Sequence, residues 1–183
     1  NQKETHSVHK DFVTLALLKV DDAAEMFDIV ERNRDHFRSF LTWIDGCTDV
    51  SHIASSIADS IKQGSHRYGI FYKGQLVGTI NFHGTDKSNM SDGVGYWLDA
   101  AYQGNGIMTA ATHQLLAIGF GQLGLNTVRI KCAVDNLASR AIPERLGFTL
   151  EGVLRQNQYL NGQYVDMALY SLLASEFPTS LVK

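Results

Sequence analysis

The sequence predicts an α/β (α+β) fold in which helices cover a mixed, mostly antiparallel sheet of about seven strands. Extended and helical patterns alternate along the whole chain, without an internal repeat, linker or low-complexity segment. A strand–helix–strand unit over residues 94–134 predicts a right-handed parallel crossover, since parallel neighbours need a long connection. Short links elsewhere predict antiparallel pairing. The clearest is Asn161-Gly162, because both residues tolerate the positive φ of a type I′ turn.

The N-terminal part is expected to be a strand followed by helices. Residues 13–20 alternate loosely, as a strand does. Asp21 or Asp22 can cap the next helix, because a carboxylate accepts the N–H groups of a first helical turn. The apolar face of that helix is formed by Ala24, Phe27, Ile29 and Val30.

Two more helices are expected before the next strand. An aromatic and aliphatic cluster over residues 37–44 predicts a short helix, with a turn at Asp45-Gly46. Asp49 then caps the clearest amphipathic helix of the chain, which Gly64 ends. The apolar residues of this helix recur at steps of three or four: Val50, Ile53, Ile57 and Ile61.

The remaining elements form the centre and the end of the sheet. Strands at 68–72 and 75–83 join at Lys73-Gly74, and a polar loop over 84–92 leads to a strand at 94–98. The rest is expected to be a loop (99–106), a helix (107–123), a strand (127–134), a helix (138–146) closed by Gly147, and a hairpin (148–159 and 164–172).

Composition favours one ordinary globular domain. The chain has 183 residues, 44% hydrophobic and 19% charged, and we expect a single domain at residues 11–183 behind a polar tail at 1–10. The net charge of −3 argues against non-specific binding to nucleic-acid phosphate. The polar first residues lack the apolar core of a secretory signal, no run is apolar enough to span a membrane, and Cys47 and Cys132 form no CxxC pair. We therefore expect a cytoplasmic protein that binds neither nucleic acid nor membrane; a homodimer stays open.

The segment most informative about function is residues 96–109. A strand there enters a loop with glycines at 104 and 106, and a helix begins at once. The N–H groups of a first helical turn have no partner within the helix, and the helix dipole adds partial positive charge. Glycines let a bulky anion approach the main chain closely. The segment therefore predicts a phosphate or pyrophosphate cradle, although glycines that only shape a loop would give the same pattern.

Two commoner phosphate cradles lack residues that their chemistry requires. A P-loop needs a lysine before its Ser or Thr, and Ile107-Met108-Thr109 has none. A dinucleotide-binding fingerprint needs a third glycine, and Thr109 stands at that position.

Two motifs resemble those of a known superfamily. Residues 103–108, Gln-Gly-Asn-Gly-Ile-Met, resemble the Gln/Arg-x-x-Gly-x-Gly/Ala motif of the GCN5-related N-acetyltransferases (the GNAT superfamily), with Met108 in place of the last Gly/Ala. Asn136-x-x-Ser139-Arg140, running into residues 144–148, resembles the strand-five and helix-four region of the same superfamily. Residues 159–162 followed by Asp166 are similar to the branch that acetylates the N-termini of ribosomal proteins. The resemblance covers nearly the whole chain.

The resemblance implies a GNAT-like acyl-CoA N-acyltransferase fold with acetyl-CoA as co-substrate. Members splay the two central parallel strands, here residues 95–98 and 127–134, so that the pantetheine arm hydrogen-bonds like an added strand. A main-chain N–H near Trp97 or Leu98 would face the thioester carbonyl, Asn136 would contact the pantetheine arm, and Ser139 would lie near the sulfur. The cofactor's phosphates would meet Gln103, Gly104, Asn105, Gly106, Ile107, Met108 and Arg140.

The implied reaction is direct attack of a neutral amine on the thioester. An α-amine with a pKa of about 7.7–8.0 is roughly 10–17% neutral at pH 7, whereas a lysine side chain is only about 0.04% neutral. Members of the ribosomal-protein branch can carry a glutamate, proposed as general base, where this chain has Gln158, and an amide cannot take that proton. Three explanations stay open: Glu151 acting through water, an α-amine that needs little help, or low activity. We favour the first two together.

Each candidate also has a purely structural interpretation. Ser139 and Tyr159 are the candidate general acids, but Ser139 can simply begin a helix and Tyr159 can be a cross-strand packing partner. Asn136 can merely cap the helix that follows, and Arg140 can be a solvated helix residue.

The acceptor is expected to meet Trp43 and Gln158, whereas Phe37 and Phe40 are assigned to the core. The seven histidines show no clustered metal spacing, so we expect no metal. The sequence thus predicts an acetyl-CoA-dependent N-acetyltransferase, most simply one for the N-terminal α-amine of a ribosomal or other protein. Two alternatives are an acetyltransferase for a small amine (a polyamine, antibiotic or metabolite) and an acyl-CoA-binding module with little turnover.

Overall fold

The computed structural model describes residues 11–178, so the tail predicted at residues 1–10 lies outside the described part. The chain divides into two compact units, which we describe one at a time. The N-terminal unit comprises residues 11–81 and 96–111, and the C-terminal unit comprises residues 82–95 and 112–178. Within residues 11–178, no helix has the length and apolar character needed to cross a membrane.

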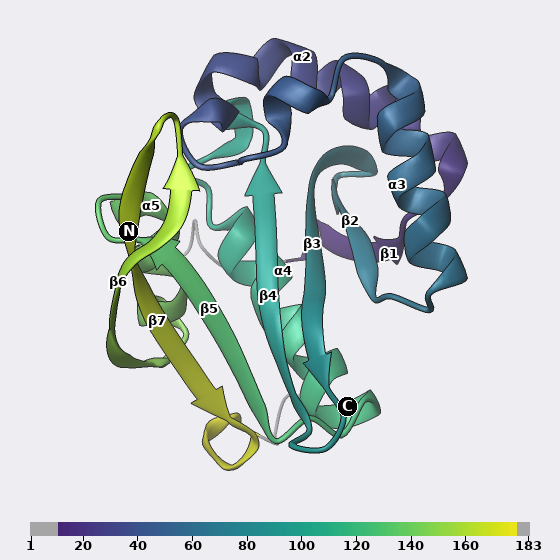
Figure 1. The fold of residues 1–183 in the computed structure, drawn as a ribbon. Helices are drawn as coiled ribbons and strands as arrows, with labels where there is room; N and C mark the ends of the chain where they lie inside the picture. The colour runs from purple at the N-terminus through teal and green to yellow at the C-terminus, as the bar shows by residue number, and fades with distance from the viewer. Residues whose placement is uncertain (1–10, 179–183) are drawn as a thin grey trace, which may run out of the picture. The chain divides into compact units, whose positions relative to one another are not determined.

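Within residues 11–178, seven strands form one sheet in the order β1-β2-β3-β4-β5-β7-β6 (Figure 1). Their bounds are β1 (Val13–Leu17), β2 (Arg67–Tyr72), β3 (Gln75–Asp86), β4 (Ser91–Leu98), β5 (Thr127–Ala133), β6 (Thr149–Leu160) and β7 (Gln163–Leu173). β4 and β5 run parallel, while β1–β2, β2–β3, β5–β7 and β7–β6 are antiparallel. The mixed, mostly antiparallel sheet is confirmed, and so is the parallel crossover.

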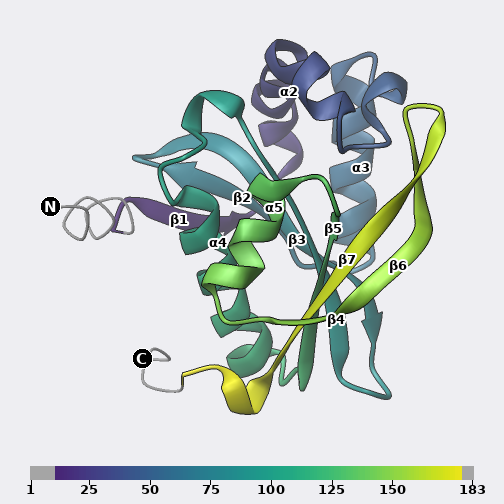
Figure 2. The ribbon, with the colours of Figure 1, turned by 90° about the vertical axis from the view of Figure 1, so that its left-hand side faces the viewer.

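Two helices of the N-terminal unit, α2 (Ala23–Arg38) and α3 (Val50–Lys62), pack side by side (Figures 1 and 2). The predicted apolar face of α2 is partly wrong, because Ala24, which was assigned to it, is exposed, whereas Ala23 is buried. The short helix predicted over 37–44 is also wrong: α2 continues through Phe37, and only a 3₁₀ turn, η2 (Ile44–Gly46), follows. The buried residues of α2 explain its length, because they recur every three or four positions up to its end: Ala23, Met26, Ile29, Val30, Asn33 and Phe37.

The two predicted helix caps have different outcomes. Asp49 caps α3 as expected, since its carboxylate accepts the Ser51 N–H at 2.7 Å. The cap predicted for α2 is confirmed in position only: Asp22 is the N-cap residue, but its side chain makes no capping hydrogen bond to the helix. β1 ends at Leu17, a 3₁₀ turn, η1 (Val20–Asp22), follows, and the Asp22 carboxylate accepts the Lys19 N–H at 2.8 Å instead.

The turns between antiparallel strands are mostly as predicted. Lys73 and Gly74 both have positive φ (50° and 80°), which confirms the tight β2–β3 turn. The polar loop predicted over 84–92 is wrong, because β3 runs to Asp86 and β4 starts at Ser91. Polar side chains stabilise this extension: the Thr85 hydroxyl donates to the Asp92 carboxylate at 2.5 Å.

The helix predicted over 107–123 is not one regular α-helix. Helix α4 (Ile107–Ala117) continues as a π-helical turn, η4 (Ile118–Gln122). At Gly119 a Cβ atom would lie 2.7 Å from the Phe82 ring, so this wider turn needs glycine to pack against β3. After β5, helix α5 (Leu137–Arg145) replaces the predicted 138–146 helix with nearly the same bounds.

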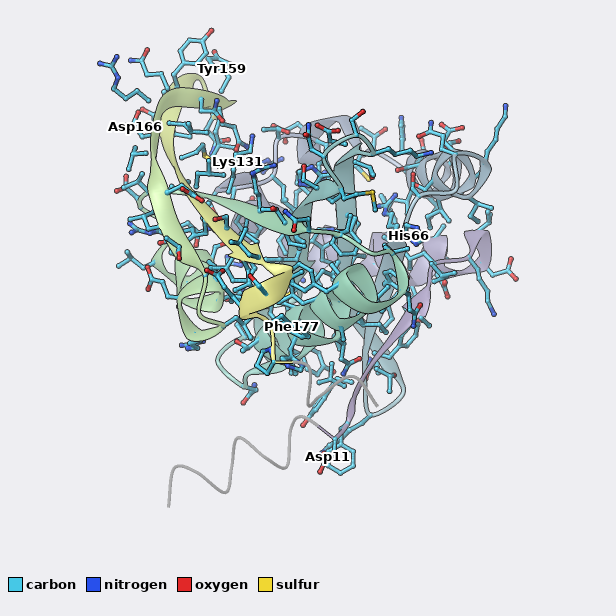
Figure 3. All side chains as sticks on the ribbon, turned by 90° about the horizontal axis from the view of Figure 1, so that it is seen from below. Asp11, His66, Lys131, Tyr159, Asp166 and Phe177 are labelled. Carbon is cyan, nitrogen blue, oxygen red and sulfur yellow. The ribbon has the colours of Figure 1, made fainter. Side chains whose placement is uncertain are left out.

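The β6–β7 hairpin is followed only by a 3₁₀ turn, η5 (Ala174–Glu176), within the described residues (Figures 2 and 3). Asn161 and Gly162 have φ of 49° and 80°, which confirms the predicted turn. β6 is irregular, with register shifts between Leu150 and Gly152 and between Leu154 and Gln158. At the second shift Gln156 adopts a φ of 50°, and its N–H donates to the Asp166 carboxylate at 2.7 Å.

Candidate active site

The predicted phosphate cradle lies in the N-terminal unit, at the connection from β4 to α4. A 3₁₀ turn, η3 (Ala100–Tyr102), leads into residues 103–106. Gly104 and Gly106 have φ of 77° and 73°, and a Cβ atom on either would point into open space. The Ala110 N–H donates to the Gly106 carbonyl at 3.0 Å, so α4 starts directly after the glycines. Positive φ, open space at both glycines and a helix N-terminus fit the approach of an anion such as a phosphate to the main chain.

The other side chains of the cradle serve the fold. The Asn105 amide donates to the Tyr102 and Gln103 carbonyls, at 3.3 and 3.2 Å, and so braces the loop. Ile107 and Met108 are buried. Met108, the departure from the family motif, therefore directs its side chain into the core rather than into the cradle. Only main-chain groups of these two residues are left to meet a phosphate.

The end of β4 is held close to its neighbours. The Trp97 and Leu98 side chains are buried, and the Trp97 ring lies 5.1 Å from that of Phe37. On β3, a Cβ atom at Gly78 would lie 2.3 Å from the Trp97 carbonyl oxygen, so only glycine permits this approach. The role predicted for Trp97 and Leu98 is thus restricted to their main chain.

A buried polar network next to the cradle was missed by the sequence analysis. The Asp99 carboxylate is only 2% exposed and accepts hydrogen bonds from Arg32, Asn33 and the Ala101 N–H. Burial opposes its ionisation, but these donors outweigh burial and lower the pKa of Asp99 below its ordinary value. Asn33 was the available signal, because it is a polar residue at an apolar position of α2, four residues after Ile29 and four before Phe37.

The predicted acceptor residue Trp43 lies just before η2 and is 38% exposed. Its neighbour Asp45 accepts a hydrogen bond from Arg38 at 2.6 Å, which ties this turn to the end of α2. Phe37 is fully buried and Phe40 is half-buried, in line with their assignment to the core.

In the C-terminal unit, three side chains meet where β5 leads into α5. The Asn136 side chain accepts the Ser139 N–H at 3.1 Å and caps α5, as its structural interpretation requires. The Ser139 hydroxyl donates to the sulfur of Cys132, a buried β5 residue, at 3.3 Å. Ser139 is thus a first-turn helix residue whose hydroxyl is directed at a thiol. This contact with Cys132 was not predicted from the sequence.

Arg140 is anchored within the unit. Its Nε donates to the Tyr170 hydroxyl at 2.9 Å, and its Nη1 donates to the Val134 carbonyl at 3.0 Å. Tyr170, which is buried, donates in turn to Glu144 at 2.7 Å. Arg140 is therefore not a solvated helix residue, and this triad connects α5 to β5 and β7.

Comparison with known proteins identifies the family of this fold. Residues 13–149 match the family described as "Acetyltransferase (GNAT) domain". The chain belongs to the GNAT family. It is therefore an N-acetyltransferase that uses acetyl-CoA, as the sequence predicted.

Two curated relatives are named for ribosomal acetylation. YdaF of Bacillus subtilis (strain 168), named as a candidate ribosomal N-acetyltransferase, is 33% identical over 91% of this chain and 94% of its own. The ribosomal-protein-serine acetyltransferase of Escherichia coli (strain K12) is 33% identical over 84% of this chain and 94% of its own.

Solved structures of GNAT enzymes match the whole fold. RimL, a ribosomal L7/L12 α-N-protein acetyltransferase in complex with CoA, has a TM-score of 0.85 at 29% identity, over 88% of this chain and 94% of its own. The microcin C7 self-immunity acetyltransferase MccE, in complex with acetyl-CoA and AMP, has a TM-score of 0.82 at 33% identity, over 89% and 93%.

The remaining predicted residues of this GNAT enzyme lie on the β6–β7 hairpin. Gln158 pairs with Val165, and Tyr159 pairs with Tyr164, whose ring lies 5.0 Å away. Glu151 lies at the first register shift of β6 and accepts a short hydrogen bond from the Ser171 hydroxyl. Ser171 pairs with Arg129 of β5, three residues before Cys132, so these contacts do not bring Glu151 to Ser139. Within residues 11–178, no cluster of three or more His, Cys, Asp or Glu could hold a metal ion.

Proposed function

We propose that this GNAT enzyme acetylates the N-terminal α-amine of a ribosomal or other protein. The observation that carries the proposal is the likeness, over more than four-fifths of the chain, to two relatives named for ribosomal acetylation. The chemistry agrees, because an α-amine is neutral often enough at pH 7 to react without a strong base. Gln158, where a general base is expected, fits such an acceptor better than it fits a lysine side chain.

The cofactor-binding roles follow the predicted motifs. Acetyl-CoA supplies the activated acetyl thioester. In the N-terminal unit, main-chain N–H groups of residues 104–108 bind its diphosphate beside Gln103, whose own N–H donates to the Ala100 carbonyl. A main-chain N–H of Trp97 or Leu98 donates to the thioester oxygen and so favours the charge that develops there. In the C-terminal unit, Asn136 contacts the pantetheine arm while its side chain also caps α5. Arg140 also contributes positive charge that attracts a phosphate of CoA, in addition to its hydrogen bonds to Tyr170 and Val134.

The proton-transfer and acceptor roles are assigned separately. Ser139 is the first candidate acid for the departing thiolate, and its hydroxyl must turn from the Cys132 sulfur, to which it now donates, to fill that role. Tyr159, 58% exposed, is the second candidate acid. Glu151 is the candidate base, acting through water; Ser171 donates to one of its oxygens and leaves the other to accept from that water. Trp43 and Gln158 contact the acceptor.

A small-molecule amine is the second candidate acceptor. The likeness to MccE favours it, since that acetyltransferase is named for self-immunity to microcin C7 and not for ribosomal proteins. A chain that binds acyl-CoA with little turnover is the third candidate, which the missing glutamate at position 158 favours. A cytoplasmic location and a homodimer stay predictions.

The test is an acceptor screen with acetyl-CoA, in which thiol release and acetylated products are measured by absorbance and mass spectrometry. Peptides with a free N-terminus are compared with the same peptides carrying a blocked N-terminus but a free lysine. We expect acetylation of the free N-terminus and little of the lysine. Acetylation of polyamines or other small amines alone would select the second candidate, and CoA binding without thiol release would select the third.

A further inference from the structure

One face of α2 contacts the β4–α4 connection at successive positions. Arg32, Asn33, His36 and Phe37 lie on this face, because residues three and four apart are neighbours on a helix. Their contacts run in order from the end of β4 to the cradle: Phe37 with Trp97, Arg32 and Asn33 with Asp99, Asn33 with Ala100, and His36 with Gln103. All these residues belong to the N-terminal unit.

Asn33 is the most constrained residue of this face. It is 5% exposed, and its amide nitrogen donates to the Ile29 carbonyl at 2.9 Å and to Asp99 Oδ1 at 3.0 Å. Its oxygen accepts the Ala100 N–H at 3.0 Å. Both sides of the amide are therefore in use, as a buried polar group requires. A leucine or alanine would maintain the apolar face of α2 but would leave Ala100 and Asp99 without these bonds.

Asp99 in turn fixes the main chain around it through its own hydrogen bonds. Its Oδ2 accepts Arg32 Nε at 3.0 Å and Nη2 at 2.6 Å, and its Oδ1 accepts the Ala101 N–H at 3.1 Å. Its own N–H donates to the Val77 carbonyl of β3 at 2.8 Å. Three successive main-chain N–H groups, those of residues 99, 100 and 101, are thus fixed immediately before the cradle.

The cradle itself has few side-chain constraints of its own. Gly104 and Gly106 have no Cβ, and each has positive φ. A glycine loop loses much conformational freedom when a ligand orders it, and a loop that is already fixed loses less. A side-chain contact does reach it from α2: the Gln103 and His36 nitrogens lie 3.0 Å apart.

We propose that Asn33 is a positioning residue for CoA binding, which acts through Asp99 and Ala100 to hold the main chain of the diphosphate loop in its binding conformation. The proposal rests on the diphosphate-binding role of residues 104–108 proposed above, and it does not depend on which amine is acetylated. α2 then has a role besides packing: it sets the affinity for the nucleotide end of the cofactor.

The experiment measures dissociation constants of CoA and of pantetheine, which lacks the diphosphate, by calorimetry without any acceptor. Asn33→Ala is expected to weaken CoA binding about tenfold, since three buried hydrogen bonds are lost, two of them to Asp99 and Ala100, and to leave pantetheine binding unchanged. Arg34→Ala is the matched control, because Arg34 lies on the same helix but donates to the Ile44 and Cys47 carbonyls. It should lower the melting temperature without changing the ratio of the two dissociation constants.

Arg32→Ala is the second variant, for the case in which Asn33→Ala does not fold. Arg32 is half exposed, and its loss should weaken CoA binding in the same direction by a smaller factor. An unchanged CoA affinity in the folded variant, or an equal loss for CoA and pantetheine, would overturn the proposal. A wild-type protein that binds CoA but acetylates no amine would contradict the proposed function alone and would leave this measurement valid.

Discussion

Two strand-to-helix connections in this molecule follow the same plan but end in different ways. From β5 the chain enters α5, and the Asn136 side chain accepts the Ser139 N–H of the first turn. From β4 the chain enters α4 through Gly104 and Gly106, where any Cβ would point into open space. The start of α5 is thus capped by the chain itself, while the start of α4 is shaped by glycines.

This difference explains why only one of two similar helix starts is suited to an anion. A side-chain cap fills the space in front of a first turn and uses the N–H groups that a phosphate would need. Glycines leave that space open. The polar side chains near α4 instead fix the main chain just before it, through Asp99 and Asn33.

The largest effect is expected from closing the space before α4. Gly104→Val and Gly106→Val each force a branched side chain into a positive-φ position and place it where phosphate oxygens approach. We expect CoA affinity, measured by calorimetry, to fall roughly a hundredfold. Gly74→Val is the matched control, since Gly74 has the same positive φ in the β2–β3 turn. If both cradle variants bind CoA as the wild type does, the diphosphate lies elsewhere.

A smaller effect is expected from removing the cap of α5. Asn136→Ala should lower the free energy of unfolding by about 1 kcal/mol, measured in urea. Asn136→Asp should restore it, because a carboxylate also caps a helix start. CoA affinity should fall in both variants if the amide contacts pantetheine. Wild-type CoA affinity in Asn136→Asp would show that Asn136 only caps α5 and does not contact pantetheine.

The smallest effect is a difference in acid sensitivity between the two connections. Asp99 has a lowered pKa when folded, so its contribution to stability is present above its ordinary pKa of about 3.9 and is lost as pH falls through the folded-state value. The stability difference between wild type and Asp99→Asn should therefore shrink below about pH 4 in urea unfolding. The loss caused by Asn136→Ala should not change over the same range, since an amide does not titrate. Parallel pH profiles for both variants would contradict this assignment.

Local signals in the sequence predicted local structure well. Asn161-Gly162 and Lys73-Gly74 encode their turns through their own φ preferences, and Asp49 encodes its cap through a neighbouring N–H. The errors arose where tertiary contacts decide. The π-helical turn after Ala117 depends on Gly119 packing against Phe82, and the extension of β3 depends on Thr85 bonding to Asp92.

The same distinction holds for the site. The glycine cradle consists of consecutive residues, so its position could be predicted from the sequence. The network of Arg32, Asn33 and Asp99 joins residues more than sixty positions apart. The spacing of apolar residues along the sequence does not predict a contact over such a distance. A polar residue within an apolar helix face, such as Asn33, is the signal that would have shown that a buried partner exists.

The irregular course of β6 has a consequence for how the molecule meets other copies of itself. Among residues 11–178, β6 is the last strand of the sheet order, so its outer edge pairs with no further strand of this part of the chain. Its two register shifts divide that edge into regular runs of only two or three residues: Thr149–Leu150, Gly152–Leu154 and Gln158–Leu160. Runs this short offer too few consecutive hydrogen bonds to seed edge-to-edge aggregation, although Leu150 and Val153 are exposed there.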